Sequence, residues 1–78
     1  MISLIDLPDG SIATIKSVKG GHGLIQKIEA LGIREGKEIK RVGKQWMKGP
    51  VIIRAGQTEL AIGYGMARRI MVEIIKAC

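Results

Sequence analysis

The chain has 78 residues, which is the size of one domain. With 46% hydrophobic and 26% charged residues, its composition is that of a globular protein rather than a disordered one. One cysteine, Cys78, excludes a disulfide within the chain, and together with one histidine, His22, it makes no plausible zinc site. The net charge is +6, and residues 34–78 carry ten basic and four acidic side chains. This asymmetry permits an anionic partner, although a solvated basic face explains it more simply.

The first residues, 1–6, lack the basic region and the long apolar run of a signal peptide. No apolar run of the chain is long enough to cross a membrane. We therefore expect a cytoplasmic protein that does not span the membrane.

The first elements are a turn and a strand. Pro8-Asp9-Gly10 has turn chemistry, because proline presets φ and glycine accepts unusual dihedral angles. Residues 11–19 are rich in β-branched side chains and predict a strand. The glycines at 20–23 then favour a compact strand-to-helix connection over a phosphate loop, because no Gly-Lys-Ser/Thr follows them. We expect His22 to be an exposed loop residue.

A short α-helix is predicted at about residues 23–31. Leu24, Ile28 and Leu31 recur at i, i+4 and i+7 and so share one face. Gly32 follows where a glycine closes a helix in the left-handed conformation. We expect the three apolar side chains to plug one end of a barrel.

The next predicted strand, at 37–44, contains an internal conflict. Its apolar anchors are Ile39 and Val42, but Lys40 and Arg41 are adjacent and should point to opposite faces. One of the two would point toward the core, unless the strand bulges or Arg41 lies near an open end of the barrel.

The second half of the chain predicts three more strands. Residues 51–55 and 58–62 form a β-hairpin around Gly56-Gln57, and 70–75 is the last strand, with Ile70, Val72 and Ile74 facing inward. The glycine-rich segment near 64–68 predicts one irregular or 3₁₀ turn. Residues 1–78 are therefore expected to form a single mainly β domain, a small five-stranded SH3-like β-barrel with one short helix.

The loop at 43–50 places Trp46 and Met47 between Lys44 and Lys48. Tryptophan is favoured as an interface anchor, so this loop is a candidate contact patch. The alternative is that Trp46 folds back as a lid on the barrel.

The residue pattern resembles the FeoA family. Leu31-Gly32-Ile33-x-x-Gly36 after a short helix is similar to that family's signature, and the match extends through Gly49-Pro50-Val51, Leu60-Ala61-Ile62 and Ala67-x-x-Ile70-x-Val72. Lys27 and Arg41 depart from it, because arginine and an apolar residue are usual there. The resemblance implies an SH3-like accessory protein of bacterial ferrous iron uptake, acting on the membrane transporter FeoB. The same domain type occurs in metal-dependent repressors of the diphtheria-toxin-repressor class.

The residues themselves indicate an interaction module rather than an enzyme. No nucleophile, base and acid can be assembled, and the acidic residues show no close metal-ligand spacing, so no cofactor or metal is expected. An alternative is nucleic-acid binding by the basic stretch from Lys37 to Arg54, although two aromatic residues are few for stacking. An exposed edge strand or methionine patch would let two copies pair. The predicted partner-binding residues are Trp46, Met47, Lys44, Lys48, Tyr64, Met66, Arg68 and Arg69.

Overall fold

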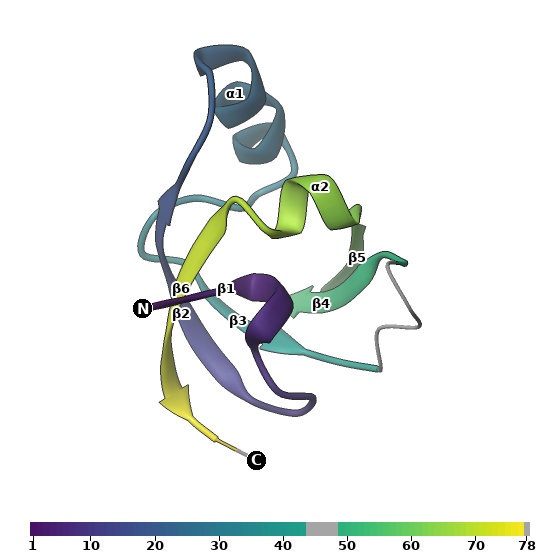
Figure 1. Cartoon of the computed structure of the whole chain (residues 1–78). Helices are drawn as coiled ribbons and strands as arrows, with labels where there is room; N and C mark the ends of the chain where they lie inside the picture. Colours follow the sequence, from purple (N-terminus) through teal and green to yellow (C-terminus); the bar gives the residue numbers. More distant parts are fainter. Residues whose placement is uncertain (44–48, 78) are drawn as a thin grey trace.

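The computed structural model describes residues 1–43 and 49–77, and its main feature is a strongly bent antiparallel sheet (Figure 1). The strands are β1 (Ile2–Ser3), β2 (Ile12–Val18), β3 (Glu38–Arg41), β4 (Val51–Ala55), β5 (Thr58–Ile62) and β6 (Ile70–Lys76). The helical elements are the 3₁₀ helix η1 (Leu4–Asp6) and the α-helices α1 (His22–Ala30) and α2 (Tyr64–Ala67).

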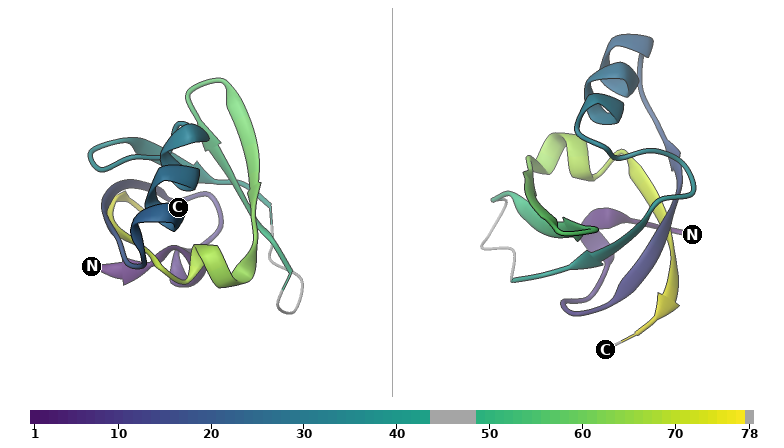
Figure 2. Two further views of the ribbon diagram at one scale, coloured as in Figure 1. Left: turned by 90° about the horizontal axis from the view of Figure 1, so that it is seen from above. Right: turned by 180° about the vertical axis from the view of Figure 1, so that it is seen from behind.

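The six strands lie in the order β1-β6-β2-β3-β4-β5, and every neighbouring pair is antiparallel. The sheet bends around one core, and in the described part of the chain β1 and β5 remain its two unpaired edges (Figure 2). The predicted mainly β fold is confirmed. The prediction of five strands missed β1, because two residues are too few to show an alternating pattern.

The core lies on the inner face of the sheet, because side chains alternate along each strand. It consists of Leu4, Leu7, Ala13, Ile15, Ile28, Ile33, Ile39, Val51, Ile53, Ile62, Ala67, Ile70 and Val72. Ile74, which was predicted to face inward, lies opposite buried Ala13 in the register, but its side chain is 41% exposed. β1 pairs with β6 only at Met71 and Val72, so at Ile74 strand β6 has a neighbouring strand on the β2 side alone.

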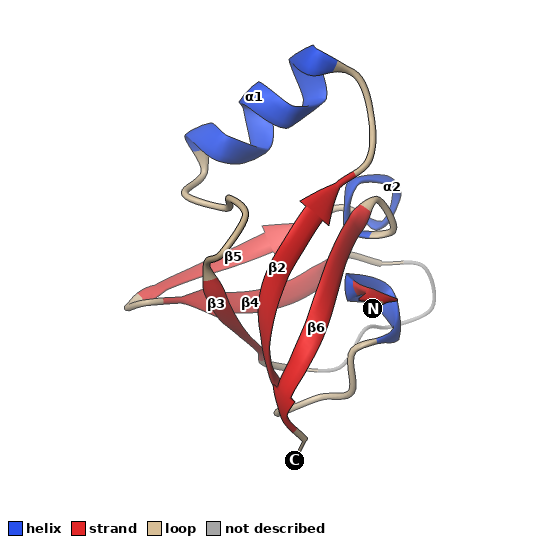
Figure 3. Ribbon diagram, turned by 90° about the vertical axis from the view of Figure 1, so that its left-hand side faces the viewer, coloured by secondary structure: helices blue, strands red, loops and turns tan. Residues whose placement is uncertain are grey.

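Helix α1 stands at one end of the bent sheet and is joined to it by loops (Figures 1 and 3). It begins at His22, which is exposed as expected but is helical rather than part of a loop. Its end is closed as predicted by Gly32 (φ +86°), with the Ile33 N–H donating to the Ile28 carbonyl. This reversal buries Ile28 and Ile33 together.

The prediction that Leu31 helps to plug the barrel is wrong, because its side chain is 44% exposed. Leu31 is the C-cap residue, at which the chain leaves the helical path, and the buried side chain at this end is Ile33. Leu24 is partly buried and packs against the core. Only Ile28 of the predicted apolar face is fully buried.

Two tight turns are confirmed, and one helical turn differs from the prediction. The backbone N–H of Ser11 donates to the Pro8 carbonyl and closes the turn at Gly10. Gly56 adopts φ +66° in the β4–β5 hairpin. The segment after Gly63 is one turn of α-helix, because Ala67 N–H donates to the Gly63 carbonyl at 2.8 Å, an i to i+4 bond. The expected short helical turn near residues 64–68 is therefore confirmed, but it is α-helical rather than irregular or 3₁₀.

Candidate functional site

Helix α2 and the two residues that follow it carry four of the predicted partner-binding residues, Tyr64, Met66, Arg68 and Arg69. Its Ala67 is buried and its Met66 packs against the core, so these two side chains fix the helix to the barrel. Tyr64 is half-buried, whereas Arg68 and Arg69 are exposed. Of the predicted set, Tyr64, Arg68 and Arg69 are therefore at least partly accessible, whereas Met66 packs against the core.

The backbone brings three basic residues close together where β6 begins beside the end of β2. We call Lys19, Arg68 and Arg69 the basic cluster. The Lys19 N–H donates to the Arg69 carbonyl at 2.7 Å, which extends the β2–β6 pairing beyond Val18 and Ile70. All three side chains are exposed, and within residues 1–43 and 49–77 no carboxylate forms an ion pair with them. Their charge is therefore available to a partner.

The backbone at Gly20 allows this arrangement. Gly20 has φ +143°, and a Cβ atom there would lie 2.6 Å from Cδ2 of Leu24 and 3.6 Å from Nη1 of Arg69. The Arg69 guanidinium thus lies over the connection that leads into α1. Sequence reasoning selected Arg68 and Arg69 but missed Lys19, because only the strand register brings it beside them.

Lys44, Trp46, Met47 and Lys48 lie outside the described residues. Their predicted role as a contact patch, and the alternative of a lid, both remain predictions.

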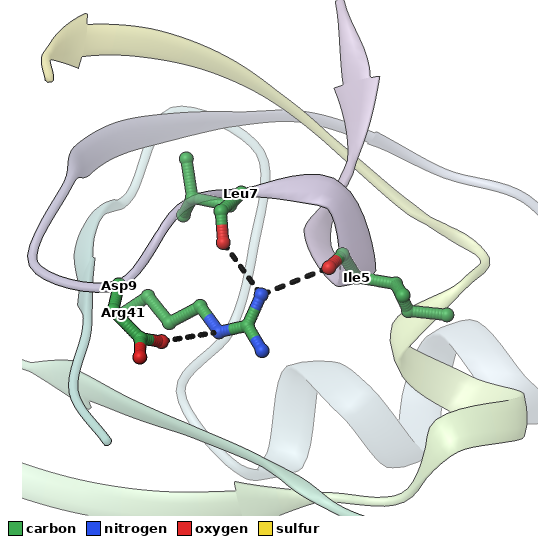
Figure 4. A network of polar contacts seen from close by, with 4 residues as sticks. All are labelled: Ile5, Leu7, Asp9 and Arg41. Atoms are coloured by element: carbon green, nitrogen blue, oxygen red, sulfur yellow. Dashed lines mark hydrogen bonds and ion pairs between the residues drawn. The ribbon is translucent and has the colours of Figure 1, made fainter. Parts of the chain in front are cut away.

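Arg41 settles the conflict found in the sequence of β3. Its side chain points inward and is 6% exposed, whereas Lys40 is exposed. The guanidinium Nη1 donates to the carbonyls of Ile5, at 2.8 Å, and Leu7 (Figure 4). Its Nε lies 3.3 Å from Oδ1 of Asp9. Arg41 therefore holds the N-terminal segment against β3.

The basic stretch from Lys37 to Arg54 carries less free charge than the sequence indicates. Arg41 is paired with Asp9, and Nη2 of Arg54 donates to Oε2 of Glu59 at 2.9 Å. Among the described residues of this stretch, Lys37 and Lys40 are exposed and form no ion pair, whereas Arg54 is exposed but paired. Two of the basic residues of this stretch, Arg41 and Arg54, are therefore engaged within the chain, whereas no ion pair engages the three residues of the basic cluster in residues 1–43 and 49–77.

Two shallow cavities lie on the surface. One of about 170 Å³ lies between α1, the end of β2 and the loop after α1, with Val18, Ile25 and Ile33 in its lining. Another of about 180 Å³ lies over Ile12, Lys40 and Arg54. Both are smaller than the roughly 300–1,000 Å³ of typical small-molecule sites.

Neither a metal cluster nor a membrane span is found among the described residues. No group of three or more His, Cys, Asp or Glu side chains there could hold a metal ion. No helix in residues 1–43 or 49–77 has the length and apolar character needed to cross a bilayer.

A bent antiparallel sheet around one apolar core, with short helices at its margins, defines a small SH3-like barrel domain. A family model for the FeoA domain matches residues 2–74. The chain therefore belongs to the FeoA-domain family, as its resemblance indicated.

Three similar proteins support this assignment. A Methanocaldococcus jannaschii protein provisionally named Fe(2+) transport protein A is 36% identical over 73 residues, covering 94% of this chain and 87% of that protein. The crystal structure of an iron uptake regulatory protein, FeoA, has a TM-score of 0.84 at 31% identity, covering 95% and 96% of the two chains. Zinc-complexed FeoA of Stenotrophomonas maltophilia, described as an SH3-domain protein, has a TM-score of 0.79 at 26% identity, covering 94% and 91%.

The fold is also shared with a metal-dependent regulator. The manganese regulator SloR aligns with a TM-score of 0.82 at 18% identity, and the match covers 34% of its chain. At this identity the likeness concerns the fold alone.

Proposed function

We propose that this chain is a non-catalytic accessory protein of ferrous iron uptake, which binds the cytoplasmic part of a FeoB-type membrane transporter. Family membership over residues 2–74 is the observation that carries the proposal. The name of the M. jannaschii relative and the proposed role of S. maltophilia FeoA as an activating factor for ferrous iron transport support it.

The basic cluster is the contact surface that we assign to this partner. Arg68 and Arg69 are exposed at the end of α2, and Lys19 lies beside them through its backbone bond to Arg69. Half-buried Tyr64 supplies an aromatic side chain on the same helix. An apolar centre rimmed by charge is typical of non-obligate protein interfaces, so we expect an acidic surface on the partner.

Titration calorimetry with the purified cytoplasmic domain of the transporter tests this proposal. We expect binding that weakens at higher salt and that drops at least about tenfold for the Arg68→Glu/Arg69→Glu variant. The matched control, Lys37→Glu/Lys40→Glu, makes the same change in net charge on and next to β3 and should bind like the unmodified chain. Absence of binding in every nucleotide state of the domain, with normal iron uptake in a deletion strain, would refute the proposal.

The same variants separate this function from nucleic-acid binding. If the chain instead shifts single-stranded RNA at low salt and does not bind the transporter domain, the basic cluster serves nucleic acid. We expect no such shift, because Arg41 and Arg54 are already paired with carboxylates.

A further inference from the structure

Strand β5 is an open edge of the sheet. It pairs with β4 along all five of its residues, from Thr58 to Ile62. On its other side, no further strand of the described residues pairs with it. Figure 3 shows β5 at the margin of the sheet, with α1 standing beyond it. An unpaired edge of this kind is a template for a further strand.

The two edges of the sheet differ in how they are protected. The β1 edge is only two residues long, and a very short edge strand is a common protection against unwanted pairing. The β5 sequence, Thr-Glu-Leu-Ala-Ile, contains no lysine and no proline, and its register with β4 is continuous, without a bulge. β5 therefore lacks the lysine, proline or bulge that protects many edge strands, and its one charged side chain is Glu59.

The hairpin geometry decides which backbone groups face the open edge. A two-residue turn, Gly56-Gln57, makes Ala55 and Thr58 a hydrogen-bonded pair, and bonded and non-bonded pairs then alternate along the ladder. Glu59 and Ala61 consequently direct their N–H and C=O groups outward. Their side chains are exposed on the outer face, whereas Leu60 is half-buried on the inner face.

The charges beside this edge indicate the chemistry of an added strand. The register places Lys40, Arg54 and Glu59 in one row across β3, β4 and β5, so the row ends on a carboxylate at the open edge. A cation on an added strand would place Glu59 between two positive charges. A second copy of β5 would bring another Glu59 and no cation.

We propose that the β5 edge binds an extended segment of the partner protein as an additional strand. This segment carries a lysine or arginine beside Glu59 and an apolar side chain beside Leu60. Main-chain hydrogen bonds supply much of the affinity in this mode, and the alternate side chains supply specificity. The inference rests on the proposed function, because it takes the transporter's cytoplasmic domain as the source of the segment.

Amide hydrogen exchange, measured by NMR with and without that domain, tests the inference. We expect exchange at the Glu59 and Ala61 amides to slow at least about tenfold when the domain binds. Binding with protection only elsewhere would overturn this inference and leave the proposed function intact, whereas absence of binding would overturn both. Protection that rises with the concentration of the chain alone would identify a second copy at the edge and also overturn the inference.

A pair of substitutions at one position gives an independent test. Ala61→Pro removes an outward N–H while leaving the β4-facing groups of its neighbours, and proline is tolerated on edge strands in this orientation. We expect it to weaken binding at least about tenfold, whereas Ala61→Val, which keeps the N–H, should bind at least as tightly as the unmodified chain. Equal affinity of the folded proline variant would overturn the inference. If that variant fails to fold, the exchange measurement on the unmodified chain decides.

Discussion

Replacing Arg41 with alanine should test how the N-terminal segment is held. The substitution removes the donor to the Ile5 and Leu7 carbonyls and the ion pair with Asp9. It also leaves a gap in the interior, because the Arg41 side chain is only 6% exposed. The perturbation therefore combines lost hydrogen bonds, unpaired acceptors and lost packing.

The magnitude follows from how deeply these groups are buried. Removing one partner of a buried ion pair lowers the free energy of unfolding by roughly 3–5 kcal/mol. The Asp9 side chain is 38% exposed and the Ile5 contact is only partly buried, so water can replace part of what is lost. We therefore expect a loss of about 3 kcal/mol, at the lower end of that range. A domain of this size has roughly 4–12 kcal/mol of stability, so it should still fold. Each kcal/mol lost lowers Tm by about 4–8 °C, so Tm should fall by about 12–24 °C.

Thermal and urea unfolding followed by circular dichroism would measure this loss. Arg41→Lys keeps the charge but not the planar fork of donors, so it should lose an intermediate amount of stability. Asp9→Asn is the milder control and should cost less than about 1 kcal/mol, because that carboxylate is partly solvated. If Arg41→Ala lowers the free energy of unfolding by less than about 1 kcal/mol, the reasoning about a buried anchoring arginine is wrong.

Three further predictions concern α1, and all use the free energy of unfolding from urea denaturation. Gly20→Ala should cost about 1–3 kcal/mol, because the new Cβ atom would lie 2.6 Å from Leu24 in a backbone conformation that favours glycine. Gly23→Ala should instead stabilise by about 0.5 kcal/mol, since it adds a methyl group in open space on the helix; equal signs for the two would contradict this account. Ile28→Ala should cost about 2–5 kcal/mol and Leu31→Ala less than about 1 kcal/mol, and the reverse order would restore Leu31 as a plug.

The sequence predicts the local structure of α1 well and its docking less well. The i, i+4 spacing and Gly32 place the helix and its end correctly, because both depend on nearby residues. The exposure of the Leu31 side chain could not be predicted in the same way. It depends on where the chain turns after the helix, and the turn at Gly32 directs Ile33 rather than Leu31 into the core.

Strand pairing explains most of what the sequence did not reveal. Local alternation finds β2, β4, β5 and β6, but the two residues of β1 become a strand only because β6 lies beside them. For the same reason, Lys19 was absent from the predicted contact residues, although it lies next to Arg69 in space. Such neighbours are set by strand register between segments far apart in the sequence, and no short window along the chain contains both.

Arg41 also changes how the charge of the chain is interpreted. In sequence it adds to the basic stretch from Lys37 to Arg54, which favoured an anionic partner there. In the fold its charge is directed inward to Asp9 and two carbonyl groups, and Arg54 is paired with Glu59. A count of basic residues cannot separate such internal cations from those that remain free. Charge reversal at Arg68 and Arg69, in the surface assigned to the partner, should therefore weaken binding, whereas the same reversal at Lys37 and Lys40 controls for the change in net charge alone.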